Sequence, residues 1–530
     1  MELRRVIALS IFKFRNIRLV LTSISTEYST TTHLGIQQAG VYKIVRHISM
    51  EFVTDSIASF QRKYPNVKRV VGFVLFLILG FLLVNNFRPS PQSEVVKPLP
   101  QDPEVKVYFN HNEAAKYEDP YRHLRRKGDN LEQQMIDAIK RAESTVDVAV
   151  MEFRLPKVAE ALIAKHSNGV KIRVLIDNKY NKTLSDYTPE AISRMNPHDK
   201  LAFEQLKLYP ADALARLRES GIEIKDDTSG GATKGSGLMH HKFIVIDGTT
   251  TIISSGNFTT SDMHGDFNNL ESRGNPNNMV VVPDNIELAQ AFTDEFNAMW
   301  QGLFKSHKPY RTPLTIPVGE GTMTVNFSPS SRKQDIEKTS NGLIADFLAQ
   351  TLSSVHIAVF VYSDQTISNT LGEVHDKGVE DIKVLIDPDF YTKPYSKAFD
   401  AMGVCPALGK RKSKIQVHPW DNPITTVGFP IAPSGDRGVH SKMAILDGRV
   451  TIAGSHNWSN SGNYLNDETL IAIDNPIVAA HYEREFSRLY KTAVVGLKSL
   501  PHAQPCGSDR SGGSGQPVSP ADLDSVSSDG

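Results

Sequence analysis

The chain has 530 residues, of which 40% are hydrophobic and 22% are charged, and this composition excludes a largely disordered protein. Lys plus Arg (59) equals Asp plus Glu (59), so a protein that binds nucleic acid through bulk positive charge is not indicated. The length leaves room for two domains of ordinary size.

The N-terminal region carries a basic stretch followed by an apolar one. Residues 1–69 contain more Lys and Arg than Asp and Glu, and Val70–Val84 is uncharged and apolar. We therefore predict a transmembrane anchor at 70–87 in a single-pass membrane protein, with the N-terminus cytoplasmic and the catalytic body extracytoplasmic. Two alternatives stay open. The N-terminal region could be cleaved, giving a secreted or organellar protein, or translation could begin at Met50.

Two further segments are poor in apolar residues. Residues 88–106 are rich in proline and predict an extended linker. Residues 501–530 consist mainly of Gly, Ser, Pro and Asp, and predict a disordered tail. The spacing of Cys405 and Cys506 fits neither a metal site nor a disulfide framework, so both are predicted to be unpaired thiols.

The region between these segments repeats itself. Strands that alternate with helices of about ten residues are typical of βαβ units. We therefore predict a duplicated α/β domain with two mostly parallel sheets, one half at 107–305 and the other at 306–500. The matching elements are helices at Leu131–Ala142 and Leu343–Leu352, strands at Val146–Val150 and Val355–Val359, helices at Pro156–Lys165 and Gln365–His375, strands at Ile172–Asp177 and Ile382–Asp387, and short strands at Ile222–Ile224 and Ile415–Val417.

Each half carries the same motif, His-x-Lys-x4-Asp. Side chains at i and i+2 of a strand share a face, so His and Lys are expected to project into one cleft. The Asp-Gly pair that follows predicts a turn, and we interpret the two aspartates as mainly positional. The motifs are His240, Lys242 and Asp247 in the first half and His440, Lys442 and Asp447 in the second.

A Ser-x-Asn pattern follows each motif at the same offset. Histidine can act as a nucleophile or as an acid and base near neutral pH. Lysine and asparagine can donate to the oxygens of a phosphate and stabilise its transition state. No set of carboxylates suited to two metal ions accompanies them, so neither a metal site nor a cofactor is expected. The substrate-binding candidates are Ser255, Asn257, Ser455 and Asn457.

The paired motifs resemble the HKD signatures of the phospholipase D superfamily, over roughly residues 107–500. The resemblance implies two α/β halves, each with a sheet of seven or more strands, joined around a pseudo-two-fold axis with one active site between them. It also implies metal-independent phosphodiester hydrolysis in two steps. One histidine attacks phosphorus to form a phosphohistidine, and the other protonates the leaving alcohol and then activates water.

The resemblance suggests a role for each histidine. In this superfamily a carboxylate downstream of each Ser-x-Asn commonly orients a histidine of the opposite half. Glu468 fits this place in the second half, and Asn278 aligns with it in the first. By this pattern Glu468 orients His240 as the nucleophile, and His440 serves as the acid. Glu271 is a competing candidate for the missing carboxylate.

Two substrate classes share this chemistry. We favour phospholipase D-type cleavage of phospholipids to phosphatidic acid and an alcohol, because the predicted anchor would hold the body near a phospholipid bilayer. Zero net charge fits this preference. The alternative is a membrane-anchored endonuclease that cuts DNA or RNA. Both motifs lie in one chain, so a monomer is expected.

Overall fold

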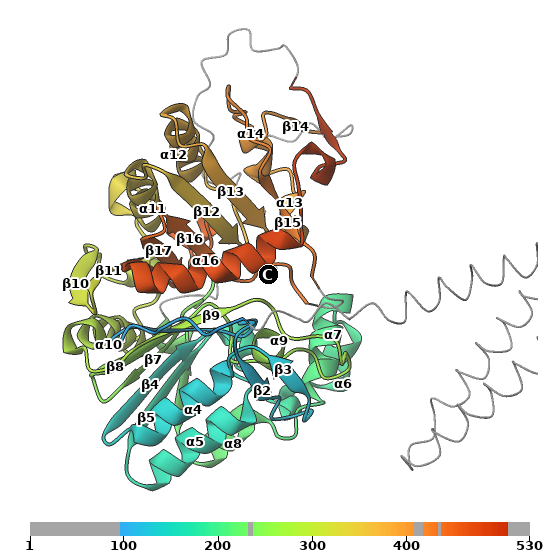
Figure 1. Cartoon of the computed structure of the whole chain (residues 1–530). Helices are drawn as coiled ribbons and strands as arrows, with labels where there is room; N and C mark the ends of the chain where they lie inside the picture. Colours follow the sequence, from blue (N-terminus) through green and yellow to red (C-terminus); the bar gives the residue numbers. More distant parts are fainter. Residues whose placement is uncertain (1–95, 232–236, 408–416, 433–435, 507–530) are drawn as a thin grey trace, which may run out of the picture. The chain divides into compact units, whose positions relative to one another are not determined.

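The computed structural model describes residues 96–231, 237–407, 417–432 and 436–506, and within them two large sheets form the framework (Figure 1). The first sheet has seven strands in the order β1-β9-β8-β7-β4-β5-β6. Its strands are β1 Lys106–Phe109, β4 Thr145–Val150, β5 Lys171–Ile176, β6 Glu223–Asp226, β7 Lys242–Ile246, β8 Thr250–Ser254 and β9 Asn278–Val282.

The second sheet repeats this plan and extends it at both edges. Its nine strands run in the order β10-β11-β18-β17-β16-β12-β13-β15-β19. Its strands are β10 Leu314–Val318, β11 Gly321–Ser328, β12 Ser354–Val359, β13 Asp381–Ile386, β15 Val427–Pro430, β16 Lys442–Leu446, β17 Val450–Gly454, β18 Glu468–Asp474 and β19 Ala493–Val495. The predicted duplicated α/β fold is confirmed.

Strand direction differs from the prediction of mostly parallel sheets. In the first sheet only β4–β5 and β5–β6 pair in parallel, and the other four neighbouring pairs are antiparallel. In the second sheet β12–β13 and β13–β15 are the parallel pairs. A parallel pair needs a long crossover, whereas the motif strands turn back directly into their neighbours and must pair antiparallel.

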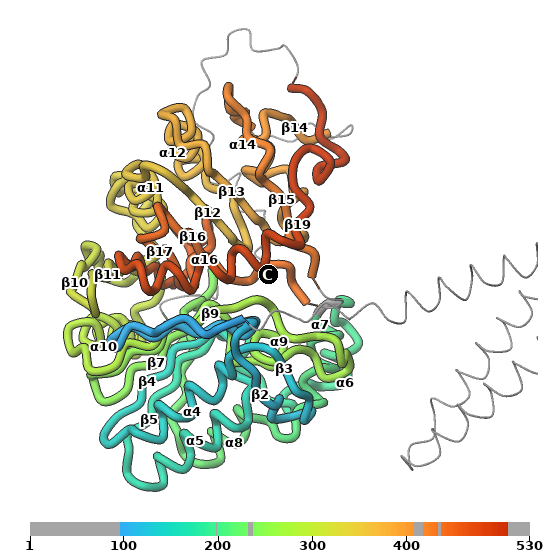
Figure 2. The backbone as a smooth tube through the Cα atoms, in the orientation of Figure 1, coloured from blue at the N-terminus to red at the C-terminus, as the bar shows by residue number. Residues whose placement is uncertain are grey.

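Helices cover both sheets and also fill the space between them (Figure 2). One apolar core joins residues from strands of both sheets with α10 and α16, so these two helices pack between the halves. The outer helices are α4 Leu131–Arg141, α5 Pro156–Ser167 and α8 Ala213–Glu219 on the first sheet, and α11 Ser340–Ala349, α12 Gln365–Asp376 and α14 Ala398–Ala401 on the second. The central helices are α10 Ile286–Trp300 and α16 Pro476–Lys491.

The predicted helices and strands are found within a few residues of their expected bounds, with one exception. The third short strand of the second half was placed at Ile415–Val417. Residues 415 and 416 lie outside the described residues, and Val417 is not in a strand. β15 takes this place and pairs in parallel with β13, Val384 opposite Val427.

The two motif hairpins owe their shape to an Asp-Gly pair. Asp247 and Gly248 have φ of 52° and 64°, and Asp447 and Gly448 have φ of 52° and 60°. Positive φ at both central residues defines the tight turn whose twist matches that of the flanking strands, and Asp and Gly tolerate it best. β7 therefore pairs with β8, and β16 with β17.

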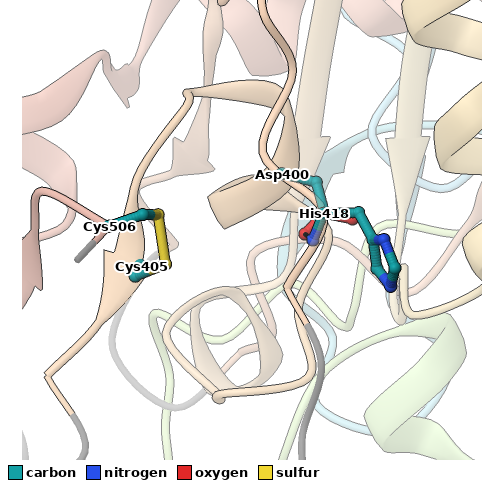
Figure 3. Close-up of a disulfide and its surroundings, with 4 residues drawn as sticks. All are labelled: Asp400, Cys405, His418 and Cys506. Carbon is teal, nitrogen blue, oxygen red and sulfur yellow. Dashed lines mark hydrogen bonds between the residues drawn. A yellow bond between two sulfur atoms is a disulfide. The ribbon is translucent and has the colours of Figure 1, made fainter. Parts of the chain in front are cut away.

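A disulfide joins Cys405 to Cys506, so the prediction of two unpaired thiols is wrong (Figure 3). Two short strands, β14 Cys405–Pro406 and β20 Ala503–Gln504, pair beside it. A sequence separation of 101 between the two cysteines concealed this proximity. The start of the predicted disordered tail is therefore tied to the second half, and residues 507–530 lie outside the described residues.

The predicted localisation in a membrane needs correction. Across the described residues, no helix combines the length and the apolar character that a bilayer crossing requires. The segment predicted as the anchor, 70–87, lies outside those residues. The prediction of a single-pass membrane protein is therefore not retained.

The described end of the predicted linker, 96–106, contacts α16, where the Pro100 carbonyl lies 2.9 Å from His481 Nε2.

Candidate active site

The N-terminal end of each motif strand contacts the opposite half of the molecule. The His240 amide donates to the Asp467 carbonyl at 2.9 Å, just before β18 of the second half. In return the His440 and Ser441 amides donate to the Pro276 carbonyl, just before β9 of the first half, at 3.3 and 3.0 Å. This exchange brings both histidines to the boundary between the halves, so the two motifs contribute to one site.

A buried carboxylate holds the chain just ahead of each histidine. Asp177 Oδ2 accepts the Met239 amide at 2.9 Å, and Asp387 Oδ2 accepts the Gly438 and Val439 amides at 2.8 and 3.1 Å. Burial raises the pKa of Asp177 and of Asp387 to about 6. In the sequence these two residues stand out only as the ends of matched strands, although their recurrence in both halves was an available signal.

His240 contacts the carboxylate expected for it. Its Nδ1 lies 2.6 Å from Glu468 Oε2, and both side chains are buried. The Ser455 hydroxyl donates to the same oxygen at 2.8 Å. Burial, reinforced by Lys242 and Lys442, lowers the pKa of His240 well below its usual value. A neutral imidazole whose Nδ1–H faces a carboxylate carries its free lone pair on Nε2.

The partner of His440 differs from the prediction. Its Nδ1 lies 3.0 Å from Asn277 Oδ1 and 3.6 Å from Asp262 Oδ1. Asn278, which the sequence alignment placed opposite Glu468, receives instead the Tyr482 hydroxyl at 3.1 Å. The alignment was wrong by one residue, and a one-residue slip in a strand turns a side chain to the other face. Glu271, the competing candidate, is exposed.

The Ser and Asn candidates divide into two kinds. The Ser255 hydroxyl donates to Asn277 Oδ1 at 2.7 Å, as Ser455 does to Glu468, so both serines hold the groups that contact the histidines. Asn257 and Asn457 each have a buried side-chain oxygen for which the described residues provide no hydrogen-bond partner. Buried polar groups are normally paired, so these two oxygens are candidates for contact with a substrate or water.

The two motif lysines are buried beside the histidines. Lys242 Nζ donates to the His240 carbonyl at 2.8 Å, and Lys442 Nζ donates to the His440 carbonyl at 2.5 Å. Burial lowers the pKa of Lys242 to about 7 and that of Lys442 to about 8. Two ammonium groups at one site provide positive charge for an anionic phosphate. Their attraction to that phosphate is stronger in this buried site than it would be in water.

The neighbouring His241 faces away from the site. Its Nδ1 lies 2.8 Å from the Thr469 hydroxyl, and its Nε2 lies 3.1 Å from Glu295 of α10. The alternation of side chains along a strand accounts for this direction, because His240 and Lys242 share the opposite face. His241 therefore belongs to the packing between the halves.

The motif aspartates lie at the other end of the motif strands. Asp247 accepts the amides of Glu143, Ser144 and Thr145 at 2.7 to 2.8 Å, where β4 begins. Asp447 accepts the equivalent amides at the start of β12. Each aspartate follows a five-residue strand, which spans about 16 Å. They hold the hairpins, and they lie too far from the histidines to touch the same phosphate.

Within the described residues, no group of three or more His, Cys, Asp or Glu side chains is arranged to hold a metal ion. The site instead brings together two imidazoles, two ammonium groups and two carboxamides. These groups can attack phosphorus, move a proton and neutralise phosphate charge. The arrangement therefore suits the cleavage of a phosphate diester.

The chain matches the family model described as "Cardiolipin synthase, PLD-like domain" over residues 135–300 and 344–490. It is 29% identical over 161 residues to a mitochondrial cardiolipin hydrolase of Xenopus tropicalis, covering 30% of this chain and 57% of the relative. With the human protein of that name it shares 25% identity over 174 residues, covering 33% of this chain and 52% of the relative. The chain thus spans about half the length of the curated relatives that it matches.

Solved structures of low sequence identity also match. Nuc of Salmonella typhimurium, a phospholipase D family member, is 21% identical, covers 37% of this chain and 94% of its own, and gives a TM-score of 0.23. The phosphatidylserine synthase of Haemophilus influenzae is 12% identical, covers 75% of this chain and 88% of its own, and gives a TM-score of 0.46. Because the family model matches within both halves and covers more than half of the residues, the chain belongs to the phospholipase D superfamily.

Proposed function

We propose that this protein is a phosphodiesterase that cleaves phospholipids, releasing an alcohol and leaving phosphatidic acid. The observation that carries the proposal is the contact of His240 with Glu468 across the two halves, at 2.6 Å. A carboxylate on Nδ1 fixes the ring and increases the basicity of Nε2, which a nucleophilic histidine needs. The family match and the names of the relatives support phospholipid as the substrate class.

The proposed reaction has two balanced steps. In the first, His240 Nε2 bonds to phosphorus, the bond from phosphorus to the leaving oxygen breaks, and His440 gives its Nε2 proton to that oxygen. In the second, His440 takes a proton from water while the water oxygen attacks phosphorus, and the bond to His240 breaks. Lys242 and Lys442 balance the charge of the phosphate oxygens in both steps.

Both halves of one chain supply this site, because Glu468 of the second half contacts His240 of the first, and Asn277 of the first contacts His440 of the second. We propose that one chain is sufficient for activity. We also propose that the two halves span residues 107–305 and 306–500.

The first test presents the 530-residue chain with phosphatidylcholine vesicles, cardiolipin vesicles and single-stranded DNA, all in EDTA. We expect release of alcohol from at least one lipid, and a loss of about 10³-fold or more in His240→Asn and in His440→Asn. Asp284→Asn, at an exposed carboxylate outside the site, is the matched control. Cleavage of DNA alone would overturn the proposed substrate class, and activity that requires an added metal ion would overturn the mechanism.

A further inference from the structure

The groups that contact His440 differ from those that contact His240. Glu468 provides a carboxylate 2.6 Å from His240 Nδ1, whereas His440 Nδ1 faces the Asn277 amide oxygen at 3.0 Å. A carboxylate stands farther back, because Asp262 Oδ1 lies 3.6 Å from the same nitrogen. The first half therefore does supply a carboxylate near His440, but it comes from Asp262 and not from the residue that corresponds to Glu468.

Hydrogen bonds show that Asn277 occupies the place of Glu468. The Ser255 hydroxyl donates to Asn277 and accepts the next amide, that of Asn278, at 3.0 Å. In the second half the Ser455 hydroxyl donates to Glu468 and accepts the next amide in the same way, also at 3.0 Å. The first half thus carries a neutral carboxamide where the second half carries a carboxylate.

At Asp262 the difference between the halves is reversed, because the first half carries a carboxylate that the second half lacks. It lies on the short helix α9 Thr260–Met263, whose N-cap Thr259 accepts the Asp262 amide. In the second half, α15 Asn460–Tyr464 has the N-cap Ser459, which accepts the Gly462 amide. A Cβ atom at Gly462 would lie 2.3 Å from the Asn457 carbonyl oxygen, so no side chain fits there. A carboxylate at this position is therefore confined to the first half.

The amide of Asn277 fixes the protonation of the His440 ring. Asn277 Nδ2 donates to the carbonyls of Asp262 and Asn275, both at 3.2 Å, so its oxygen must face His440. An amide oxygen only accepts, hence His440 Nδ1 carries a hydrogen. Nε2 is then the ring nitrogen that exchanges a proton with the leaving group, and it is protonated only in the imidazolium form.

Asp262 is held so that it stays charged. Its Oδ2 accepts the Asn257 amide and its Oδ1 accepts Asn275 Nδ2, each at 2.7 Å. Burial raises the pKa of Asp262, but His440 and these hydrogen bonds more than offset this and leave the pKa below its usual value. A fixed negative charge therefore stands beside His440, which otherwise faces cations.

We propose that Asp262 is the positioning residue that stabilises the protonated form of His440, the general acid, while Asn277 fixes the orientation of its ring. This inference rests on the proposed function. Among the described residues, the charged groups that most affect His440 are Asp262 from α9, Lys442 from β16, Lys242 from β7 and Arg437 from the segment before β16. Asp262 is the anion of this set, and the other three disfavour the imidazolium.

The test compares Asp262→Asn, Asn277→Asp and the double variant, with Asp284→Asn as the control. Without the Asp262 charge, His440 loses its proton at lower pH. We expect kcat to fall at least tenfold with KM little changed, and the alkaline limb of the kcat profile to move down by about one pH unit. The double variant restores a carboxylate beside His440, so we expect it to recover most of the lost kcat and move the limb back up.

Histidine NMR gives a readout that does not depend on turnover. The ring ¹⁵N signals of His440, assigned with His440→Gln, should titrate at lower pH in Asp262→Asn than in the wild type. An unchanged titration, or a loss of kcat with no movement of the alkaline limb and no recovery in the double variant, would overturn the role of Asp262. A wild-type chain that cleaves no phosphodiester would overturn the proposed function alone, because the titration still reports on Asp262.

Discussion

At the scale of single residues, the two motifs share a spacing but not an environment. His240 pairs directly with the carboxylate of Glu468, while His440 donates to the amide of Asn277 with Asp262 behind it. Burial lowers the pKa of His440 well below its usual value, although Asp262 opposes this shift. An anionic phosphodiester in the site would oppose it further, so substrate binding favours the protonated acid.

The motif lysines give the site a pH dependence. Burial lowers the pKa of Lys242 to about 7 and that of Lys442 to about 8, so both ammonium groups lose their charge as the pH rises through these values. We expect kcat/KM to fall as the pH rises from 7 to 9, because the neutral amines no longer attract phosphate. A bound phosphate anion raises the pKa of both lysines, so kcat should persist to higher pH.

Steady-state kinetics between pH 6 and 10 check this expectation. Lys491→Met removes an exposed lysine at the end of α16 and should leave both profiles unchanged. A kcat/KM that stays constant between pH 7 and 9 would show that the lysine charge does not limit substrate capture.

At the scale of single elements, each motif hairpin is fixed by its aspartate. Asp247 accepts three backbone amides and the Ser144 hydroxyl, and its φ of 52° disfavours most side chains. We expect Asp247→Ala to lower the free energy of unfolding by about 1 to 3 kcal/mol, measured by urea denaturation. The kcat of the folded fraction should change by less than about threefold, because Asp247 does not reach the reacting atoms.

Two variants separate the causes of this loss. Asp284→Ala places alanine at a similar φ of 53° on an exposed residue, and so it measures the backbone strain alone. Asp247→Asn keeps a side chain that tolerates this conformation and one acceptor oxygen, and it should lose less stability than Asp247→Ala. A stable, folded Asp247→Ala protein without activity would contradict the positional role.

The elements also show what a single sequence can predict. The helices and strands followed from their periodicity and from the repeat, because each half buries the same pattern. The partner of His440 did not, because Asn277 and Asn278 are adjacent and identical, and only the pairing of β9 with β8 decides which one faces the site. Asp262 was missed although the offset that aligns Asn257 with Asn457 also aligns it with Gly462, because the sequence does not show that this carboxylate lies beside His440 of the opposite half.

At the scale of the whole molecule, the two halves complete each other. α10 and α16 fill one apolar core between the sheets, and the backbone hydrogen bonds at Asp467 and Pro276 bring the two motif histidines to the boundary between the halves. The disulfide between Cys405 and Cys506 could not be predicted, because two cysteines that meet across several intervening strands and helices leave no mark in their spacing along the chain. The site depends on this assembly, because His240 and its partner Glu468 come from opposite halves, as do His440 and its partner Asn277.

In the proposed mechanism a single site serves both steps, with His240 of one half attacking phosphorus while His440 of the other acts as the acid. Rapid quenching of the chain with a ³²P-labelled phosphodiester, followed by peptide mapping, identifies the histidine that is phosphorylated. We expect label on His240 in the wild type, label on His240 that forms more slowly but persists in His440→Asn, since that variant lacks both the acid of the first step and the base of the second, and none in His240→Asn. Label on His440, or label retained in His240→Asn and lost in His440→Asn, would contradict the claim.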